Sequence, residues 1–221
     1  MEFSVMLELL IKGTAMTVEI FFVTLVLSLP LGMLVCFGRM SKNIVVRSFF
    51  KFYISVMRGT PLMLQLMVFY FGPFYLFGMQ ITETWKQLAW ILGFSLNYAA
   101  YCAEIYRGGI NSIDRGQYEA AHALGLSRRQ TMGDIILPQT MKAILPPVVN
   151  EAITLVKDTA LASSLPVIEL MKATNSAVNR MTDMTPFFFA AIIYLIMTFV
   201  LTVIAGRLER HFSRYDAKGE W

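Results

Sequence analysis

The chain has 221 residues, of which 56% are hydrophobic and 15% are charged, and its mean hydropathy is +0.57. Because soluble domains carry about 25% charged residues, this composition excludes a soluble globular protein and predicts an integral membrane protein. The formal net charge is +4. Lys and Arg gather on the cytosolic side of membrane proteins, so orientation explains this charge and no nucleic-acid partner is expected.

Five apolar runs predict five transmembrane helices, each of which needs about 17 to 25 residues. In chain order they cover residues 14–38, 49–79, 88–106, 143–156 and 186–205. The fourth run is short, and Pro146 and Pro147 are expected to break it. The chain has no internal repeat or long linker, so residues 1–221 are expected to form one all-α, polytopic membrane domain.

The positions of the 19 Lys and Arg residues predict the orientation of the chain. Most of them lie between the first two runs, after the third run or after the last one. The positive-inside rule then places the N-terminus outside the cell and the C-terminus in the cytosol. The tail, residues 207–221, is expected to face solvent and lipid headgroups. Residues 1–4 include no basic residue, so no cleavable signal peptide is expected.

A polar segment, residues 114–138, separates the third run from the fourth. Its first helix-forming residues are Glu119, Ala120 and Ala121. Gly125 can adopt the left-handed conformation that ends a helix, and Ser127 can cap the helix that follows. The segment is therefore predicted to form a short helix, a turn and a second helix, a shape that suits a socket on a soluble partner. The alternative is a plain cytosolic loop whose small residues merely pack.

Two further features of the third run are expected to be structural. Glu104 lies three positions before Arg107, a spacing that permits an intrahelical ion pair. Asn97 can link helices through its side-chain amide.

Cys36 and Cys102 fall inside apolar runs and are expected to act as small buried hydrophobic residues.

The pattern from Glu119 through Gly125 to Ile135, Leu137 and Pro138 resembles the coupling motif of ATP-driven (ABC) importers, with which their permease subunits grip the ATPase. Other phrases resemble the polar amino-acid branch of these importers. They are RGTPL at 58–62, NYAAY at 97–101 with its continuation to 110, and KDTAL at 157–161. The resemblance covers residues 13–209, and the permeases of histidine, arginine and glutamine transporters are the nearest familiar relatives.

This resemblance implies a type I ABC importer permease in a prokaryotic inner membrane, with cytosolic coupling helices. The ATPase-coupling residues would be Glu119, Ala120, Ala121, Gly125 and Leu126. The implied partners are ATPase subunits, an extracytoplasmic substrate-binding protein, a second permease copy or sister subunit, and an amino-acid substrate. The chain has no Gly-rich phosphate loop, so it is expected to be a transport subunit without cofactor, with ATP and Mg²⁺ bound by the ATPase.

Substrate contacts are expected in the fourth run. Glu151, Thr154 and Asp158 can share one helix face, which would be acidic and could receive an α-ammonium group or the side chain of a basic amino acid. The alternative is that Glu151 is a buried carboxylate paired with Lys157 or with another helix. The candidate substrate-binding residues are Asn97, Asn150, Glu151, Thr154 and Asp158. Arg58 is interpreted as an anchor at the inner headgroups, and Pro61 suits the first turn of a new helix.

Three alternatives to this interpretation were considered: a metal site, a secondary carrier or channel, and an ABC permease for another cargo. His122 and His211 have no ligand-like neighbours, so no metal site is proposed. A self-sufficient secondary carrier or channel would have no use for the coupling motif. An ABC permease for a different cargo would keep that motif but lose the phrases at 58–62 and 97–110.

Overall fold

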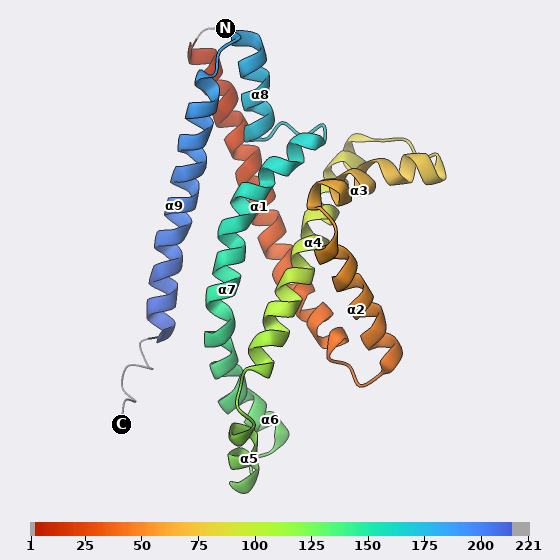
Figure 1. Cartoon of the computed structure of the whole chain (residues 1–221), viewed down its shortest axis with the longest axis vertical. Coiled ribbons are helices and arrows are strands. Elements are labelled where there is room, and N and C mark those ends of the chain that lie inside the picture. Colours follow the sequence, from red (N-terminus) through yellow and green to blue (C-terminus); the bar gives the residue numbers. More distant parts are fainter. Residues whose placement is uncertain (1–2, 214–221) are drawn as a thin grey trace.

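The computed structural model describes residues 3–213, and every element in this range is helical (Figure 1). The α-helices are α1 (Phe3–Arg39), α2 (Ile44–Gly59), α3 (Leu62–Phe77), α4 (Glu83–Asn111), α5 (Arg115–Ala123), α6 (Arg128–Gln130), α7 (Leu137–Asp158), α8 (Leu170–Met181) and α9 (Thr185–Ser213). A π-helix, η1 (Thr131–Ile136), leads into α7, and a 3-10 helix, η2 (Thr159–Ser164), follows it. The all-α fold predicted from the sequence is confirmed.

The long helices α1, α4, α7 and α9 run along the long axis of the molecule (Figure 1). α1 begins at one end, and α5 and α6 project at the other end, toward which α9 also descends. Of the described helices, α1 and α9 are long and apolar enough to cross a membrane, and a third span results if α2 and α3 are counted together. Five crossings therefore stay a prediction. The predicted headgroup contacts of residues 214–221 lie outside the described residues.

The second apolar run was expected to supply one transmembrane span, but it forms two helices, and the second of them begins directly after Pro61, where a new helix was expected. α2 and α3 meet at an angle of 109°. Thr60, between them, is extended, with φ −122° and ψ 151°, which is the conformation that a following proline favours. Pro61 lacks a backbone N–H and cannot continue the α2 hydrogen bonds. The hydropathy of the run could not show where the chain turns, whereas Pro61 marks that place.

The fourth run also differs from its prediction, because α7 is one continuous helix of 22 residues that contains Pro146 and Pro147. Both prolines are exposed on the described chain, and interior prolines are tolerated in membrane helices where neighbouring groups satisfy the freed carbonyls. The irregular turns lie at the ends of α7 instead, in η1 and η2. The expected break at the prolines is therefore wrong.

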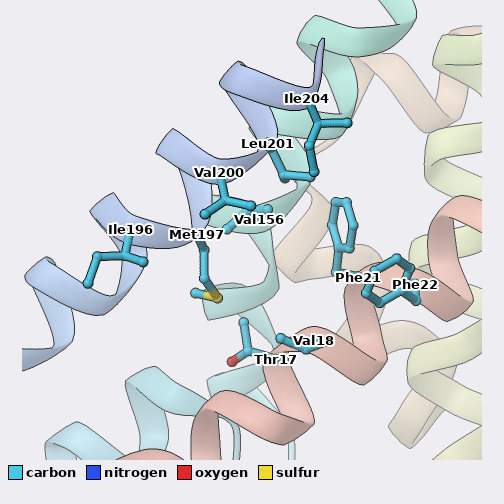
Figure 2. A pocket seen from close by; sticks show the side chains of 10 residues that line it. All are labelled: Thr17, Val18, Phe21, Phe22, Val156, Ile196, Met197, Val200, Leu201 and Ile204. Atoms are coloured by element: carbon cyan, nitrogen blue, oxygen red, sulfur yellow. The ribbon is translucent and has the colours of Figure 1, made fainter. Parts of the chain in front are cut away.

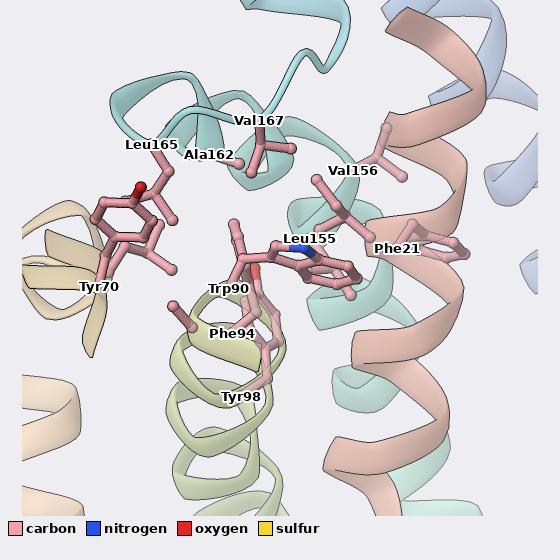
Figure 3. Packing of buried hydrophobic residues seen from close by; sticks show 13 residues of the cluster. Phe21, Tyr70, Trp90, Phe94, Tyr98, Leu155, Val156, Ala162, Leu165 and Val167 are labelled. Atoms are coloured by element: carbon pink, nitrogen blue, oxygen red, sulfur yellow. The ribbon is translucent and has the colours of Figure 1, made fainter. Parts of the chain in front are cut away.

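The core forms where α1 packs on α4 and both meet α7. Phe94, Trp90 and Tyr98 extend from α4 toward Leu155 of α7 (Figure 3). A Cβ atom on Gly32 of α1 would lie only 2.6 Å from the Cβ of Cys102, so glycine allows the two helices to approach closely.

The two cysteines lie in this close-packed region. Cys36 is 0% exposed and Cys102 is 3% exposed, and both thiols are free. Their predicted role as buried residues is confirmed.

Glu169, whose side chain is fully buried, links α8 to α9. Its carboxylate accepts hydrogen bonds from the backbone N–H groups of Met171, at 2.7 Å, and Lys172, at 2.6 Å. The Tyr194 hydroxyl of α9 donates a third, at 3.3 Å. These donors compensate for burial of the charge. Sequence reasoning missed this residue because a glutamate is not a common helix cap.

Candidate functional site

The turn after α5 is closed by Gly125, which has a φ of +73°. The N–H of Leu126 donates to the carbonyl of Ala121 at 3.1 Å, and that of Gly125 donates to the carbonyl of His122 at 2.9 Å. This pair of bonds is a Schellman motif, which satisfies the last carbonyls of a helix. The left-handed conformation predicted for Gly125 is confirmed.

The helix after this turn begins with a reciprocal capping box. The hydroxyl of Ser127 accepts a hydrogen bond from the N–H of Gln130 at 3.3 Å, and the Ser127 N–H donates to Oε1 of Gln130 at 3.0 Å. The predicted Ser127 cap is confirmed. The segment 114–138 is therefore a compact helix, turn and helix, followed by η1, and is not a plain loop.

Residues 114–138, which we call the coupling segment, are exposed at positions that a partner could reach. Glu119, Ala120 and Gly125 are exposed, whereas Ala121 is 1% exposed and packs inward. Leu124 is 77% exposed, a large apolar side chain at the turn that sequence reasoning missed. A hollow of about 470 Å³ lies beside it, lined by Tyr118, His122, Leu126, Arg128, Thr131 and Met132. The coupling segment therefore presents both the projecting side chain of Leu124 and the adjacent hollow to a partner.

A second set of polar groups lies on α7. Because α7 is continuous, Glu151, Thr154 and Asp158 lie on one face of it. All three are half-buried. The Tyr98 hydroxyl of α4 donates to Oδ2 of Asp158 at 2.7 Å, so Asp158 already has one partner. Asn150, the neighbour of Glu151, is exposed.

Glu151 has no such partner within the described chain. The ion pairs that the structure shows between described residues join Lys12 to Glu8, Lys86 to Glu83 and Arg107 to Glu104, and none of them includes Glu151. The alternative in which Glu151 pairs with Lys157 is thus not observed here, and Lys157 is exposed. Glu151 is therefore an acidic group on a half-buried helix face that has no ion-pair partner among the described residues.

Arg58 approaches the same region from the last turn of α2. Its guanidinium carbon lies 5.1 Å from the ring centroid of Tyr101, and the Tyr101 ring lies 6.3 Å from that of Tyr98. We call Arg58, Tyr98, Tyr101, Glu151 and Asp158 the polar cluster.

The phrases RGTPL at 58–62 and NYAAY at 97–101 were the signal for this cluster in the sequence. The phrases alone could not show that they meet, whereas the Arg58 guanidinium over the Tyr101 ring shows that they do. The role of Arg58 as a headgroup anchor stays a prediction.

The two structural predictions for α4 are confirmed. Both carboxylate oxygens of Glu104 accept hydrogen bonds from Arg107, the shortest at 2.6 Å. Asn97 is buried, and its amide nitrogen donates to the carbonyl of Met57 at 3.0 Å and to Oε1 of Gln65 at 2.9 Å. Asn97 therefore links α4 to α2 and α3, and its predicted contact with substrate stays a prediction.

A separate groove between α1, α7 and α9 is almost wholly apolar (Figure 2). Phe21, Phe22, Val200 and Ile204 are among its ten lining residues, none of which is charged. The one hydroxyl, on Thr17, accepts a hydrogen bond from the N–H of Leu170 at 3.1 Å. A charged solute would lose its hydration there without compensation, so this groove does not suit a polar substrate. Within the described residues, no group of three His, Cys, Asp or Glu side chains could hold a metal ion.

The family described as "Binding-protein-dependent transport system inner membrane component" matches residues 28–214, which is most of the chain and includes the whole coupling segment. The chain belongs to this family. The resemblance to ABC-importer permeases that the coupling motif indicated is confirmed, and this inner membrane component is a transport subunit.

Curated relatives match the component over nearly its full length. The "Putative glutamine transport system permease protein GlnP" of Rickettsia felis is 38% identical over 202 residues, 91% of each chain. The "Arginine transport system permease protein ArtQ" of Bacillus subtilis is 39% identical over 208 residues, 94% of each chain. A solved structure, "Crystal structure of an amino acid ABC transporter with histidines", is 32% identical with a TM-score of 0.86, covering 96% of this chain and 99% of that one.

Proposed function

We propose that this inner membrane component is the permease of an ABC importer that moves an amino acid into the cytoplasm by alternating access. The observation that carries the proposal is the exposed turn at Gly125, which presents Glu119, Ala120 and Leu124 to a soluble partner. ATP and Mg²⁺ would be bound by that partner, an ATPase. The names of the relatives, which include glutamine and arginine transport, support an amino-acid cargo.

Transport by the assembled system tests this proposal. The component would be reconstituted in vesicles with its ATPase and its substrate-binding protein, and uptake of L-glutamine and L-arginine would be measured with and without ATP. Uptake is expected only with ATP and with all partners present. Uptake driven by an ion gradient without the ATPase would instead make the protein a secondary carrier, and ATP-dependent uptake of a cargo other than amino acids would refute the substrate class.

Glu151 is the residue we assign to the positive group of the substrate, with Asn150, Thr154 and Asp158 as its neighbours on α7. It is half-buried and lacks an ion-pair partner among the described residues. A buried carboxylate without such a partner is costly, and a cationic ligand relieves that cost. This assignment favours a polar or basic amino acid.

Glu151→Gln keeps the size of the side chain and removes its charge. Loss of a charge-assisted hydrogen bond of about 1.5 to 3 kcal/mol should lower the apparent transport affinity about tenfold to a hundredfold. Glu19→Gln, an exposed carboxylate on α1, is the matched control and should change little. Poor assembly of Glu151→Gln with unchanged affinity in the surviving complex would show that Glu151 is structural.

The same function requires α5 and α6 to lie in the cytosol of a prokaryotic cell. Basic residues near this end, Arg115, Arg128 and Arg129, support that orientation through the positive-inside rule. A reporter fused before Met1 is expected outside the cell and one fused after Trp221 in the cytosol. Reporters on the same side would refute an odd number of crossings.

Assembly with a second permease copy or sister subunit is part of the proposal. α2 buries only Ile54 within the described chain, and its exposed apolar side chains include Val45, Phe49 and Phe52. Such a surface can pack against another permease within the membrane. Crosslinking between cysteines placed at Phe49 in two copies, or in the two sister subunits, would test this contact.

A further inference from the structure

The apolar groove between α1, α7 and α9 is open to the surrounding medium (Figure 2). Two of its lining residues, Phe21 of α1 and Val156 of α7, are buried, whereas Phe22, Val200 and Ile204 are exposed. α1 and α9 are each long and apolar enough to cross a membrane. The groove between these two helices therefore faces the hydrocarbon of the bilayer, where lipid chains can reach it.

The volume of the groove, about 250 Å³, suits an acyl chain better than a helix of another protein. One turn of an α-helix with its side chains is about 10 to 12 Å wide and about 5.4 Å long, which makes a cylinder of roughly 400 to 600 Å³. A helix could thus lie over the groove but could not enter it. A flexible hydrocarbon chain can enter, and it restores the dispersion contacts that side chains lose beside a void.

The face of α9 that lines the groove continues to a basic residue. Ile196 and Val200 are four positions apart, and Arg207 follows Val200 by seven, so all three share one helix face. Arg207 lies about 10 Å beyond Val200 along the helix, toward the end of the molecule at which α5 and α6 project (Figure 1). It is exposed, and no ion pair between described residues includes it.

Acidic side chains near the groove do not oppose Arg207. Glu209 follows it on α9 by two positions, a spacing at which side chains do not face each other. Glu19 of α1 is exposed and is not among the residues that line the groove. The guanidinium of arginine matches the oxygens of a phosphate with parallel hydrogen bonds. The groove thus ends at a cation that suits the phosphate of a lipid headgroup.

We propose that this groove binds one anionic phospholipid from the leaflet nearer α5 and α6. One acyl chain lies against Phe21, Val156 and Val200, and the phosphate lies at Arg207. A lipid with net negative charge is favoured over a zwitterionic one, in which a headgroup cation offsets the phosphate. One basic residue near an anionic headgroup gives a preference of about fivefold. The site goes beyond the proposed function, because it does not depend on what is transported.

Lipid binding to the assembled complex tests this proposal. The complex of the permease and its ATPase would be purified in detergent and titrated with dioleoyl phosphatidylglycerol or with dioleoyl phosphatidylcholine, which have the same chains. Native mass spectrometry would count the lipids that remain bound. Each copy of this chain is expected to retain one phosphatidylglycerol, and to bind phosphatidylcholine about fivefold more weakly.

Two pairs of variants separate the headgroup contact from the chain contact. Arg207→Gln should remove the preference between the two lipids, whereas Arg47→Gln, which removes the same charge from an exposed position on α2, should keep it. Val200→Phe fills the groove and should lower the binding of both lipids. Leu195→Phe adds a ring to an exposed position of α9 that does not line the groove and should change neither.

Four results would overturn the proposal, and the first needs no variant. Equal retention of the two lipids by the natural complex would remove the headgroup contact. An equal loss of preference in Arg207→Gln and Arg47→Gln would replace a site by diffuse charge. Full lipid binding by Val200→Phe would place the chain elsewhere. A cysteine at Val200 that crosslinks to another permease subunit would show that a protein helix covers the groove. Transport is not measured, so failure of the proposed function would leave these results unchanged.

Discussion

The turn between α5 and α6 and the bend between α2 and α3 both change the direction of the chain sharply, but they are held by bonds of different range. At Gly125, the closing hydrogen bonds join residues at most five positions apart. At Thr60, the amide of Gln65 donates to the carbonyl of Met57, eight positions away, at 2.9 Å. Asn97 reaches the same carbonyl from 40 positions away.

This difference separates what a segment can specify alone from what requires the fold. The Gly125 turn needs a residue that tolerates positive φ and a cap two positions later, and both are local properties. The Thr60 bend leaves carbonyls at the end of α2 that must find donors in an apolar medium. Gln65 and Asn97 provide those donors from α3 and α4.

The largest effect is expected at the local turn, for Gly125→Asp. Aspartate is one of the few non-glycine residues that adopt the left-handed conformation, so the main cost is its charge, which falls on the proposed ATPase contact. Loss of an interface hot spot of at least about 2 kcal/mol should reduce co-purified ATPase by roughly thirtyfold or more, with membrane insertion intact.

Two matched variants divide this effect into its causes. Gly125→Asn tolerates the left-handed conformation without the charge, so it should assemble better than Gly125→Asp. Gly133→Asp adds the same charge at a nearby exposed glycine with open space around it and should assemble nearly normally. Normal co-purification of Gly125→Asp would mean that the turn lies outside the contact.

A smaller effect is expected at the long-range bend, for Asn97→Leu. The variant leaves the carbonyl of Met57 and the Oε1 atom of Gln65 without this donor, which should lower the free energy of unfolding by about 1 to 3 kcal/mol. Thermal unfolding in detergent would measure it. Ser95→Ala is the control on the same helix, since the buried Ser95 hydroxyl has no hydrogen-bond partner. Equal stability of the two variants would show that Pro61 alone fixes the bend.

The smallest effect is expected for Ser127→Ala. Loss of a helix cap costs about 1 kcal/mol, and because its bonds are local, faster amide hydrogen exchange should be confined to α6 and η1. Arg129→Ala, an exposed neighbour outside the capping box, should leave exchange unchanged. If exchange also rose in α2 and α3, the coupling segment would not be the independent unit that its local bonds indicate.

The same distinction explains which predictions from the sequence succeeded. The long apolar helices, the Gly125 turn, the Ser127 cap and the pair between Glu104 and Arg107 depend on spacings of a few residues and were predicted, whereas α8 lies outside every predicted run. The bend at Thr60 and the continuity of α7 depend on neighbouring helices, so hydropathy alone gave the wrong outline for both.

The candidate site follows the same rule. Glu151, Thr154 and Asp158 were recognised together because one helix period relates them. Arg58 and Tyr101 come from different helices 43 positions apart in sequence, and only the packing of α2 on α4 brings them together. Glu169 escaped notice because glutamate is an uncommon helix cap, and its hydrogen bond from Tyr194 of α9 joins residues that are 25 positions apart.

The close packing of α1 on α4 has a practical consequence for spectroscopy. Cys36 and Cys102 are the only cysteines of the chain, and both are sealed in that interface. A maleimide reagent should therefore not label either cysteine of the natural protein. A single cysteine introduced at Leu124, whose side chain is 77% exposed, would carry a spin label or fluorophore without removal of the natural thiols. Changes in label mobility would then report when the turn at Gly125 engages a partner.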